Sequence, residues 1–598
     1  MKKESAISRI VSKSWVSEIH KENSFMTIDN VLQAKQLQYL PDDFKVTTWS
    51  KLNPYYSELE KRTIESVEDL EKWIVDMNEL MAVVGEEFNW RYVRVSQNTE
   101  DQKAAELYQY AIQELYPKIS PVENRLNQKL VNSPFLKDLP ANDYFIYTRG
   151  VQKQTELFRK ENIPLSTQDS LKAKDYGEII SKMTVEIDGE EMTLQKAGTK
   201  LEEPDRELRA SVYKKIGTRV AEDRQAMDDL FDELMKIRHQ MALNAGFENY
   251  RDYKFQSMGR FDYEVQDCYD FHESIAKEVV PVNEALIKHR KKELGLETLR
   301  PWDLSVDTTG KAPLKPFETI EELIQKSAVV LGKLHPFFGE SLKVMQQMER
   351  LDLGSRKGKH AGGYNMPLYY SGVPFIFMNA TSSFGDLRTL MHESGHAVHA
   401  MLTHDYDLVS AKSVPSEVAE LAAMTMELIT MDHWDVFFEN EDDLRRAKVE
   451  QLEGVLKTLP WVATIDKFQH WIYTNPNHSQ DEREIAWAKI YKEFSSNLVD
   501  TSGLEKFVNH RWHRQLHLFE VPFYYIEYGM AQLGAIAIWK RYRETPDQAL
   551  KDYIKALKLG YTKKIGEIYQ AAGIEFNFSQ EYVKELADFV KKELEKVI

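Results

Sequence analysis

Apolar residues recur at intervals of three and four positions along most of this 598-residue chain. Leu70, Ile74, Met77 and Met81 have this spacing, and Ser66 precedes them at a suitable N-cap position. Such spacing places apolar side chains on one face of a helix, so the chain is predicted to be mainly α. Further helices with the same pattern are predicted over residues 104–130, 208–245, 265–294, 320–338, 443–470 and 582–597.

Two stretches instead predict β-structure. Residues 183–187 and 190–194 flank Asp188-Gly189, a dipeptide typical of two-residue hairpin turns. Aromatic-rich segments at 362–370 and 374–378 predict a second pair of strands. The expected fold is therefore mainly α with a small β-sheet.

The order of these elements also predicts how the chain is divided. The first hairpin is expected to close an N-terminal helical lobe of residues 1–195, which leaves residues 196–598 as a larger second region. The proline-containing stretch 299–317 is the best candidate for a long loop. We expect it to connect subdomains rather than to separate independent domains.

Composition excludes several classes of partner. The net charge of −17 is spread along the chain without a long run of Lys and Arg, which argues against nucleic-acid binding. Cys268 is the only cysteine, so no intramolecular disulfide can form, and we expect it to be a buried, unreactive thiol. No apolar stretch of signal-peptide length follows Met1, and residues 533–539 are too few to span a bilayer. A cytoplasmic protein without a membrane partner is expected.

The segment His392-Glu393-Ser394-Gly395-His396 carries the strongest functional signal. It follows a predicted strand and a helix start at which Ser383 and Asp386 have the spacing of a capping box. Histidines four positions apart lie on one helical face, so both imidazoles can bind one metal ion. Glu393 is rotated by about 100° from His392 and can hold a water molecule on that ion without ligating it.

This arrangement has a chemical explanation and a simpler alternative. Zinc lowers the pKa of its bound water, and a carboxylate accepts the proton as that water attacks a carbonyl. The spacing therefore predicts peptide hydrolysis. The alternative is that the two histidines are ordinary packed or surface residues of a helix.

A catalytic zinc also needs a third protein ligand and an open position. The extended metzincin pattern does not apply, because His399 and Leu402 stand where it requires Gly and His. The next predicted helix offers Glu417, Glu420 and Glu427 close to one face. Glu417 is also explained as a partner of the helix dipole, whereas Glu427 can accept a hydrogen bond from the second nitrogen of a zinc-bound histidine.

A cluster of His and Tyr residues lies farther along the chain, within residues 509–528. His510, His513 and His517 have helical spacing, so a second metal site is one alternative, although carboxylates at suitable spacing do not accompany them. We favour a set of neutral donors for the oxyanion that forms when water adds to a peptide carbonyl. Core aromatics with satisfied hydroxyl groups are the other explanation of the tyrosines.

Together these segments resemble the oligoendopeptidase F family, and within it the Pz-peptidase-like branch, which is more distantly related to thimet oligopeptidase. The resemblance is carried by the 392–396 helix, by Ala419-Glu420 with Glu427, by the segment from His517 to Tyr528, and by Gly362-Gly363-Tyr364. Weaker likeness extends from about residue 50 to the C-terminus. One departure is Phe519-Glu520-Val521-Pro522, which replaces the glycine-rich loop of thimet oligopeptidase, so that enzyme's loop closure is not carried over.

The resemblance implies two helical lobes that enclose a deep substrate channel, with one zinc ion per chain at its floor. It implies that zinc is bound by His392, His396 and Glu420, that Glu393 is the general base, and that Glu427 supports a ligand histidine. It makes His517, Tyr528, Tyr525 and Tyr524 candidates for oxyanion stabilisation and substrate binding, with Tyr528 favoured and Tyr525 second, and Gly363 and Tyr364 candidates for peptide binding.

The chain is therefore predicted to be a zinc endopeptidase of short, unstructured oligopeptides, with residues 196–598 as its catalytic region. An extended peptide would pair with the edge of the hairpin over residues 364–378, and folded proteins would be too wide for the channel. Two alternatives remain open: a metallocarboxypeptidase of similar helical shape, and an inactive peptide-binding protein that keeps the fold. The oligomeric state is not predicted.

Overall fold

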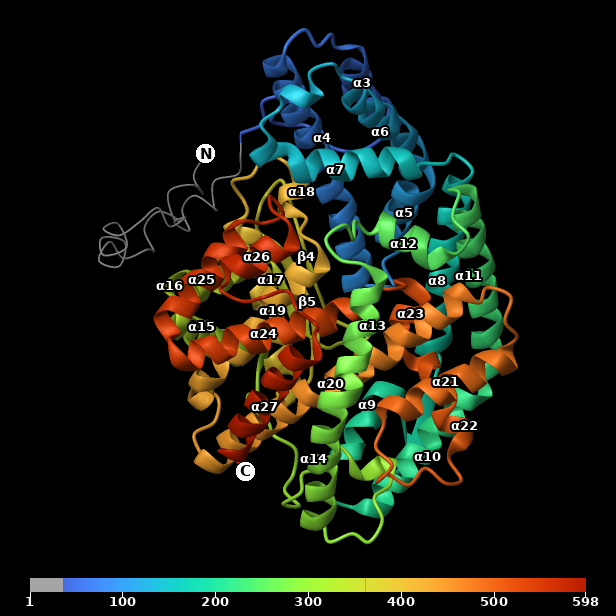
Figure 1. Ribbon diagram of the computed structural model, residues 1–598, viewed down its shortest axis with the longest axis vertical. Helices are drawn as coiled ribbons and strands as arrows, with labels where there is room; N and C mark the ends of the chain where they lie inside the picture. The colour runs from blue at the N-terminus through green and yellow to red at the C-terminus, as the bar shows by residue number, and fades with distance from the viewer. Residues whose placement is uncertain (1–35, 361) are drawn as a thin grey trace.

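The computed structural model describes residues 36–360 and 362–598, and it is mainly helical with two small β-sheets, as predicted. Figure 1 shows a small group of helices at the top of a larger body. Within the larger body, α8, α10, α11, α21 and α22 lie on one side, and α15 to α19 with α24 to α26 lie on the other (Figure 1). None of the helices in the described residues is both long and apolar enough to cross a bilayer.

The small group is built from the first helices of the chain. These are α3 (Trp49–Lys61), α4 (Val67–Gln97), α5 (Gln102–Tyr110), α6 (Tyr116–Val131) and α7 (Ala141–Leu157). Ser66 caps α4 as predicted, because its side chain accepts a hydrogen bond from the Asp69 N–H at 3.1 Å. The apolar faces of these helices enclose a core of their own, which includes Leu52, Trp73 and Leu126.

Helix α4 is long enough to leave this core and reach the larger body. Near its C-terminal end the Trp90 ring packs edge-on against Phe375 at 5.6 Å. The Asn89 side chain donates to the Pro367 carbonyl at 2.8 Å, and a Glu86 carboxylate oxygen accepts the N–H groups of Tyr370 and Ser371. One helix therefore anchors the small group to the sheet beside the candidate site.

The next elements lead to the first β-hairpin and the helices around it. The helices are α8 (Asn162–Ser181), α9 (Leu194–Thr199), α10 (Arg206–Glu222), α11 (Arg224–Asn244), α12 (Tyr250–Ser257), α13 (Val265–Ser274) and α14 (Val280–Glu293). Strands β1 (Thr184–Ile187) and β2 (Glu190–Thr193) pair antiparallel, as predicted. Asp188 and Gly189 both have positive φ, at 54° and 80°, as a type I′ turn requires. The buried side chains of the hairpin pack in the large core of the body rather than in the core of the first helices.

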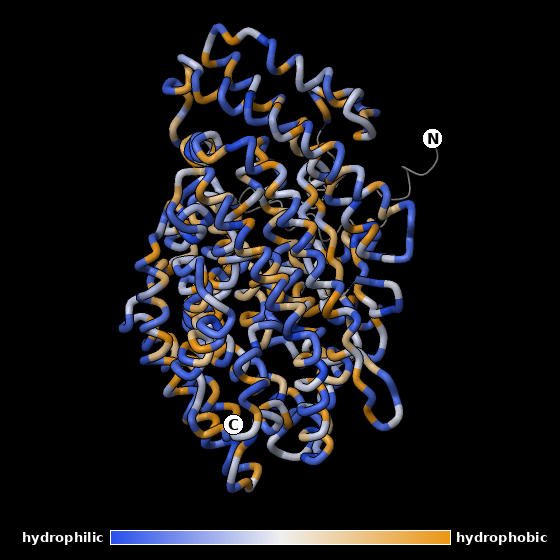
Figure 2. The backbone as a smooth tube through the Cα atoms, turned by 90° about the vertical axis from the view of Figure 1, so that its right-hand side faces the viewer, coloured by the Kyte–Doolittle hydropathy of each residue, from blue (hydrophilic) through white to orange (hydrophobic). Residues whose placement is uncertain are grey.

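The remaining helices complete the body. They are α15 (Ile320–Leu334), α16 (Pro336–Gln347), α17 (Phe384–Leu402), α18 (Val409–Lys412), α19 (Ser416–Ile429), α20 (Glu441–Thr474), α21 (Gln480–Phe494), α22 (Glu505–Val508), α23 (Leu516–Glu520), α24 (Ile526–Glu544), α25 (Pro546–Lys558), α26 (Ile565–Ala571) and α27 (Gln580–Glu595). Figure 2 shows hydrophobic and hydrophilic segments alternating along the helical tube, which is the pattern of helices that each bury one face.

Several predicted helices are interrupted where the backbone requires it. The stretch 320–338 is divided between α15 and α16 because Pro336 cannot donate the next helical hydrogen bond. The stretch 208–245 breaks at Asp223, between α10 and α11. The stretch 104–130 instead runs on from α5 into α6 through a π-turn at Ala111–Leu115.

The second predicted strand pair is part of a three-stranded sheet in the order β3-β5-β4. Strands β4 (Tyr364–Met366) and β5 (Phe375–Ala380) pair antiparallel as expected, although β4 is shorter than its predicted segment. Strand β3 (Leu351–Gly354), which was not predicted, pairs parallel with β5. Strand β5 is therefore central and buried, and β4 lies at an edge of the sheet.

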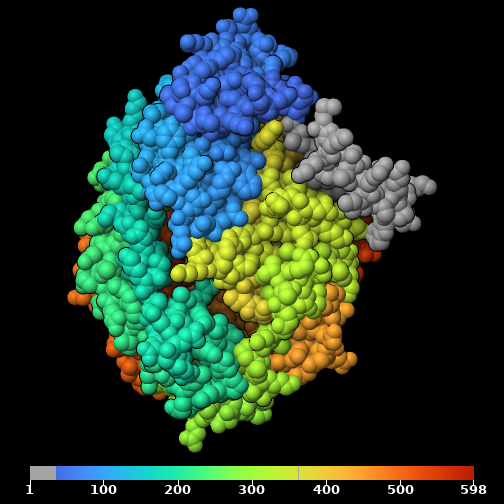
Figure 3. Space-filling model, turned by 180° about the vertical axis from the view of Figure 1, so that it is seen from behind, coloured from blue at the N-terminus to red at the C-terminus, as the bar shows by residue number. Residues whose placement is uncertain are grey.

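The chain passes from β5 into α17, the helix that carries the 392–396 segment. The predicted capping box is present: Ser383 accepts the Asp386 N–H at 3.2 Å, and Asp386 accepts the Ser383 N–H at 2.8 Å. Helix α17 packs against α19, which packs in turn against α24. Figure 3 shows a hollow on the back of the molecule, between the helices near the first hairpin and the segment that contains the three-stranded sheet.

Helices α17 and α19 can approach so closely because Gly395 has no side chain. A Cβ atom at this position would lie 2.6 Å from the Ala422 carbonyl oxygen and from the Ala423 Cα, both of them backbone atoms of α19. Backbone atoms cannot rotate away as a flexible side chain can. The glycine therefore sets the separation between the two helices.

We predict that Gly395→Ala destabilises the protein and weakens metal binding, since the two helices must move apart. Overpacking of this kind costs about 1–3 kcal/mol. Gly85→Ala is the matched control, because Gly85 lies inside α4 and a Cβ there would meet no described atom within 4 Å; alanine there is expected to be neutral or to stabilise by up to about 1 kcal/mol. Thermal unfolding and metal titration of both variants test this, and an unchanged Gly395→Ala protein would contradict it.

Candidate metal centre and active site

Three predicted ligands, contributed by two helices, meet at one point. The ligand atoms of His392 and His396 on α17 and of Glu420 on α19 all lie within 4.8 Å of one another. Glu420 Oε2 lies 3.2 Å from His392 Nε2 and 3.8 Å from His396 Nε2. This oxygen is buried and has no hydrogen-bond partner in the described part of the chain, which is costly for a carboxylate unless a cation occupies the space. Two imidazoles and one carboxylate are the donor set that catalytic zinc uses.

The electrostatics of the cluster favour positive charge. Burial opposes a charged His392, but the adjacent carboxylates of Glu420 and Glu427 outweigh burial and raise its pKa well above the ordinary value. Burial lowers the pKa of His396 to about 4, so its imidazole is neutral at neutral pH, the form that binds metals. The carboxylates that attract a proton to His392 would attract a divalent cation more strongly.

Glu427 holds His392 from the side opposite the cluster. The imidazole donates from Nδ1 to Glu427 Oε1 at 2.8 Å, which leaves Nε2 facing Glu420. The other oxygen of Glu427 accepts a hydrogen bond from the Gln451 amide of α20 at 3.1 Å. A carboxylate behind a histidine ligand fixes its tautomer and orientation. Gln451 was not predicted, because its sequence position bears no fixed spacing to the motif.

Glu393 is buried beside the ligands but does not join them. Its Oε2 atom has no hydrogen-bond partner among the described residues. Burial raises its pKa to about 7; the charge of His392 opposes this shift, and those of Glu420 and Glu427 add to it. A cation at the ligands would lower this pKa and keep the group ionised. The Glu393 carboxylate is therefore suited to accept a proton next to a metal ion.

Glu417, the alternative third ligand, has other partners. Tyr263 donates its hydroxyl hydrogen to Glu417 Oε1 at 2.5 Å, and Arg260 Nε lies 3.9 Å from the same oxygen. Glu417 is buried one turn before Glu420 and is not part of the metal-ligating cluster. Its position at the start of α19 does not bring its carboxylate to the histidines.

Tyr524 was predicted to bind substrate, and its hydroxyl contacts the candidate ligand Glu420. It donates to Glu420 Oε1 at 2.9 Å, which is the oxygen that does not face the histidines. Burial, followed by the charge of Glu420, raises the pKa of Tyr524 well above its ordinary value, so the hydroxyl stays protonated and remains a donor. Tyr524 thus orients Glu420 in the way that Glu427 orients His392.

His517 is held in one tautomer by a chain of hydrogen bonds. The Trp461 indole N–H can only donate, and it donates to Gln515 Oε1 at 3.0 Å. The Gln515 amino group therefore faces His517 Nδ1, which accepts its hydrogen at 2.7 Å. Burial lowers the pKa of His517 to about 4. The ring is neutral at neutral pH, with its hydrogen on Nε2, and neither Trp461 nor Gln515 was predicted.

Two further tyrosines surround the His517 ring. The Tyr525 ring packs edge-on against it with centroids 4.9 Å apart, and the Tyr528 hydroxyl lies 3.5 Å from His517 Nε2. Because Nε2 carries the hydrogen, the Tyr528 oxygen faces a donor, and its own O–H remains available. Burial, followed by the charge of Glu420, raises the pKa of Tyr528, so its hydroxyl stays protonated at neutral pH.

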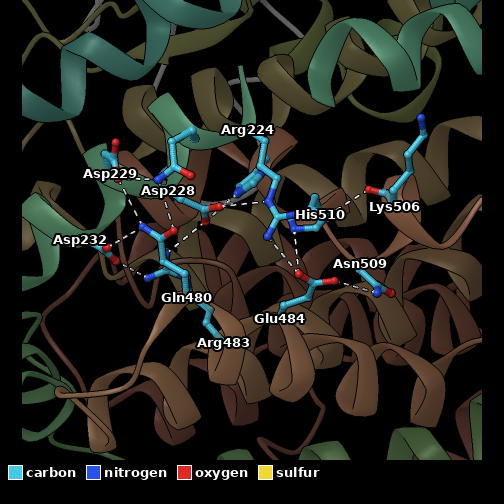
Figure 4. Close-up of polar contacts among 12 residues, drawn as sticks. Arg224, Asp228, Asp229, Asp232, Gln480, Arg483, Glu484, Lys506, Asn509 and His510 are labelled. Carbon is cyan, nitrogen blue, oxygen red and sulfur yellow. Dashed lines mark hydrogen bonds and ion pairs between the residues drawn. The ribbon is translucent and has the colours of Figure 1, made fainter. Parts of the chain in front are cut away.

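His510 and His513 do not join His517 in a second metal site. The Nδ1 atom of His510 donates to the Lys506 carbonyl at 3.0 Å, since a carbonyl can only accept, and its Nε2 lies 3.3 Å from Glu484. His513 Nε2 lies 3.1 Å from Asp228. Figure 4 shows His510 in a network of arginines and carboxylates between α11 and α21, among them Arg224, Asp228, Arg483 and Glu484. This network joins the two helices.

Gly363 and Tyr364 lie at one edge of the three-stranded sheet, at the start of β4. Tyr364 pairs with Phe377 in β5, and their rings stack at 4.9 Å. The next residue, Asn365, donates from its side chain to the Glu393 carbonyl at 3.1 Å. The edge strand is therefore fastened directly to the helix that carries the candidate base.

A strained residue precedes the tyrosines. Phe523 has a φ of 69°, which is uncommon for a residue with a side chain. Its N–H donates to Gln469 Oε1 at 2.5 Å, and its carbonyl accepts a hydrogen bond from Arg260. These two buried partners, from α20 and from the loop between α12 and α13, hold the backbone that presents Tyr524, Tyr525 and Tyr528, and neither was predicted.

We predict that Tyr524→Phe lowers metal affinity by about 10- to 100-fold, the range expected when a partner behind a ligand is lost. Competition with a chromophoric chelator measures the change. Tyr525→Phe is the control, because it removes a neighbouring hydroxyl that does not contact Glu420; its metal affinity should match that of the unmodified protein. Equal affinities for the two variants would contradict the role given to Tyr524.

Known proteins share this architecture. Residues 199–588 match the profile of "Peptidase family M3", and residues 41–158 match that of the "Peptidase M3 N-terminal domain". Oligopeptidase PepF of Bacillus subtilis is 21% identical over 555 residues, which cover 88% of this chain and 80% of that protein. An oligoendopeptidase F homologue of Borreliella burgdorferi is 25% identical over 473 residues, 75% of each chain.

Solved structures of peptidases show the same relationship. A structure of Pz peptidase A with an inhibitor superposes with a TM-score of 0.87 at 26% identity, and the match covers 93% of this chain and 99% of that one. The resemblance to the oligoendopeptidase F family, including its Pz-peptidase branch, is therefore confirmed. The family profile matches residues 199–588, which is more than half of the chain and includes the candidate site. This chain therefore belongs to peptidase family M3.

Proposed function

We propose that this protein is a zinc-dependent endopeptidase that hydrolyses internal peptide bonds of short, unstructured oligopeptides. The observation that carries the proposal is the convergence of His392, His396 and Glu420 on one point, next to the Glu393 carboxylate oxygen that has no partner among the described residues. Membership of a family of peptidases supports it. So do the names of the relatives, oligopeptidase and oligoendopeptidase F.

The proposed reaction divides the work between the cation and the side chains. Zinc bound by the three ligands would supply Lewis acidity, which lowers the pKa of a water molecule and polarises the scissile carbonyl. Glu393 accepts the proton of the attacking water and returns it to the leaving amine. Glu427 and Tyr524 keep His392 and Glu420 in place while charge develops.

The developing oxyanion is stabilised by neutral donors. Tyr528 is the favoured donor, because its hydroxyl hydrogen is not needed by His517. The Nε2–H of His517 is oriented by Gln515 and Trp461 before substrate arrives. Donors that are already aligned lower the barrier without reorganising during the reaction.

The substrate class follows from what lies beside the base. Strand β4 is at an edge of the sheet, and Asn365 within it is bonded to the Glu393 backbone. An extended peptide that added itself to this edge would run past Glu393. Only a chain without stable structure of its own can adopt that conformation within the hollow visible in Figure 3.

We predict that Glu393→Gln lowers kcat by at least about 10²–10⁴, the contribution of a general base. Metal content should stay the same, because Glu393 is not a ligand. The variant is assayed with an internally quenched peptide whose C-terminus is amidated. Glu441→Gln, an exposed position at the start of α20, is the control and should keep full activity.

Two results of this assay would overturn the proposal. Undiminished hydrolysis by zinc-loaded Glu393→Gln would show that Glu393 is not the general base. Hydrolysis of the free-acid peptide but not of its amidated form would indicate a carboxypeptidase instead of an endopeptidase.

We further predict that Gln515→Leu lowers kcat by about 10- to 100-fold, somewhat less than the roughly 10²–10³ lost with an entire oxyanion donor. KM and metal content should not change, since the substitution removes only the hydrogen bond that fixes the tautomer of His517. Trp461→Phe should act in the same direction more weakly. The double variant with His517→Asn should be no slower than His517→Asn alone; additive losses would show that Gln515 does not act through His517.

A further inference from the structure

A second group of metal-ligating side chains lies between α13 and α20. Cys268 and His272 are four residues apart on α13, and Asp466 and His470 are four residues apart on α20. Residues at this spacing share one helical face, so each helix presents a pair of side chains to the other. All four side chains are almost fully buried, with exposed fractions between 0% and 3%.

Most of their polar atoms have no hydrogen-bond partner among the residues that the structure describes. These are Asp466 Oδ1, both ring nitrogens of His470, and Nδ1 of His272. A hydrogen bond within the group joins His272 Nε2 to Asp466 Oδ2 at 2.8 Å. Leaving several buried donors and acceptors unpaired is costly, and native proteins rarely do so without an ion or a water molecule.

The atoms are also placed as ligands would be. A sulfur, a carboxylate oxygen and a ring nitrogen from Cys268, Asp466 and His470 lie within 4.8 Å of one another, and His470 Nε2 is 3.2 Å from Asp466 Oδ2. Zinc bonds of about 2.0–2.3 Å in tetrahedral geometry require ligand atoms roughly 3.3–3.7 Å apart. The Asp466–His470 distance is already close to that spacing, whereas any separation near the 4.8 Å limit would have to shorten by about 1 Å on binding.

Asp466 and Asp228 differ in how their negative charge is balanced. Asp228 is another buried aspartate with a histidine partner, His513, but Arg483 also lies 3.1 Å from its carboxylate and balances its charge. The ion pairs of Asp466 within the described residues involve only His272 and His470. A divalent cation would neutralise Asp466 together with a Cys268 thiolate.

We propose that Cys268, Asp466 and His470 bind a second divalent cation, of the thiolate- and imidazole-preferring class to which zinc and cobalt belong. His272 orients the Asp466 carboxylate, as a partner behind a ligand does in many metal sites. The cation is structural, because all three ligands are buried and belong to the contact between two helices. Cys268 is then a ligand rather than only a buried thiol.

The site would stabilise the part of the protein that carries the tyrosines. The His470 ring packs edge-on against Phe523 at 5.4 Å, and its neighbour Gln469 holds the Phe523 N–H. Fixing α20 to α13 at this point therefore fixes the strained residue that precedes Tyr524. This inference is independent of the proposed peptidase activity, since it concerns different ligands.

The single cysteine makes a decisive experiment possible. The full-length protein is produced in minimal medium with cobalt as the supplied metal, and its metal content and near-ultraviolet spectrum are measured. We expect two cobalt ions per chain and a thiolate-to-cobalt charge-transfer band, which only Cys268 can produce. One ion per chain without the band, or two ions without the band, would overturn the proposal.

Variants assign each ion to its site. Cys268→Ser and Asp466→Asn should each lose one ion and the band, whereas His396→Ala should lose one ion and keep the band. Asp228→Asn is the matched control and should keep both, because it removes a buried aspartate that Arg483 already neutralises. If Cys268→Ser fails to fold, the spectrum and metal count of the unmodified protein still decide the question.

Discussion

The candidate metal centre depends on the close approach of α17 and α19. Gly395 allows it, since any side chain there would meet the backbone of Ala422 and Ala423. The two histidines come from one helix and the carboxylate of Glu420 from the other, so their separation is set by the distance between the helix axes. A shift of about 1 Å would be enough to change ligand geometry, because zinc bonds tolerate deviations of only about 0.2 Å.

Around this contact, two of the three candidate ligands and one of the donors we assign to the oxyanion are each held by a second residue. Glu427 holds His392, Tyr524 holds Glu420, and Gln515 holds His517. Each of these bonds fixes an orientation or a tautomer before any substrate binds. Such alignment matters for catalysis, because groups that must reorganise during the reaction lose much of their effect.

Helix α20 links these separate contacts. Along its length Gln451 reaches Glu427, Trp461 reaches Gln515, and Gln469 reaches the Phe523 backbone. The same helix supplies Asp466 and His470 to the proposed second metal site. A rigid helix that contacts the partner of a candidate ligand, the partner of a proposed oxyanion donor and the strained backbone can keep all three in register, and a structural cation would fasten it to α13.

The local sequence was sufficient for the features that depend on near neighbours. Helical periodicity predicted the fold class, the capping box at Ser383 predicted the start of α17, and Asp188-Gly189 predicted the hairpin turn. The spacing of His392 and His396 placed both rings on one face, since a helix repeats every 3.6 residues. The resemblance to relatives then singled out Glu420 among three carboxylates that spacing alone left open.

Other features depended on contacts between distant segments. Strand β3 was not predicted, because a parallel strand pairs with a segment beyond its own turn. Gln451, Trp461 and Gln515 carry no local signal, since each becomes important only where the segment that holds it packs against another. Cys268 shows the contrast most clearly: the sequence established that it is a single thiol without a disulfide partner, and only the packing of α13 against α20 placed it beside Asp466 and His470. Spacing along the chain determines what one helix presents, whereas packing determines what that helix meets.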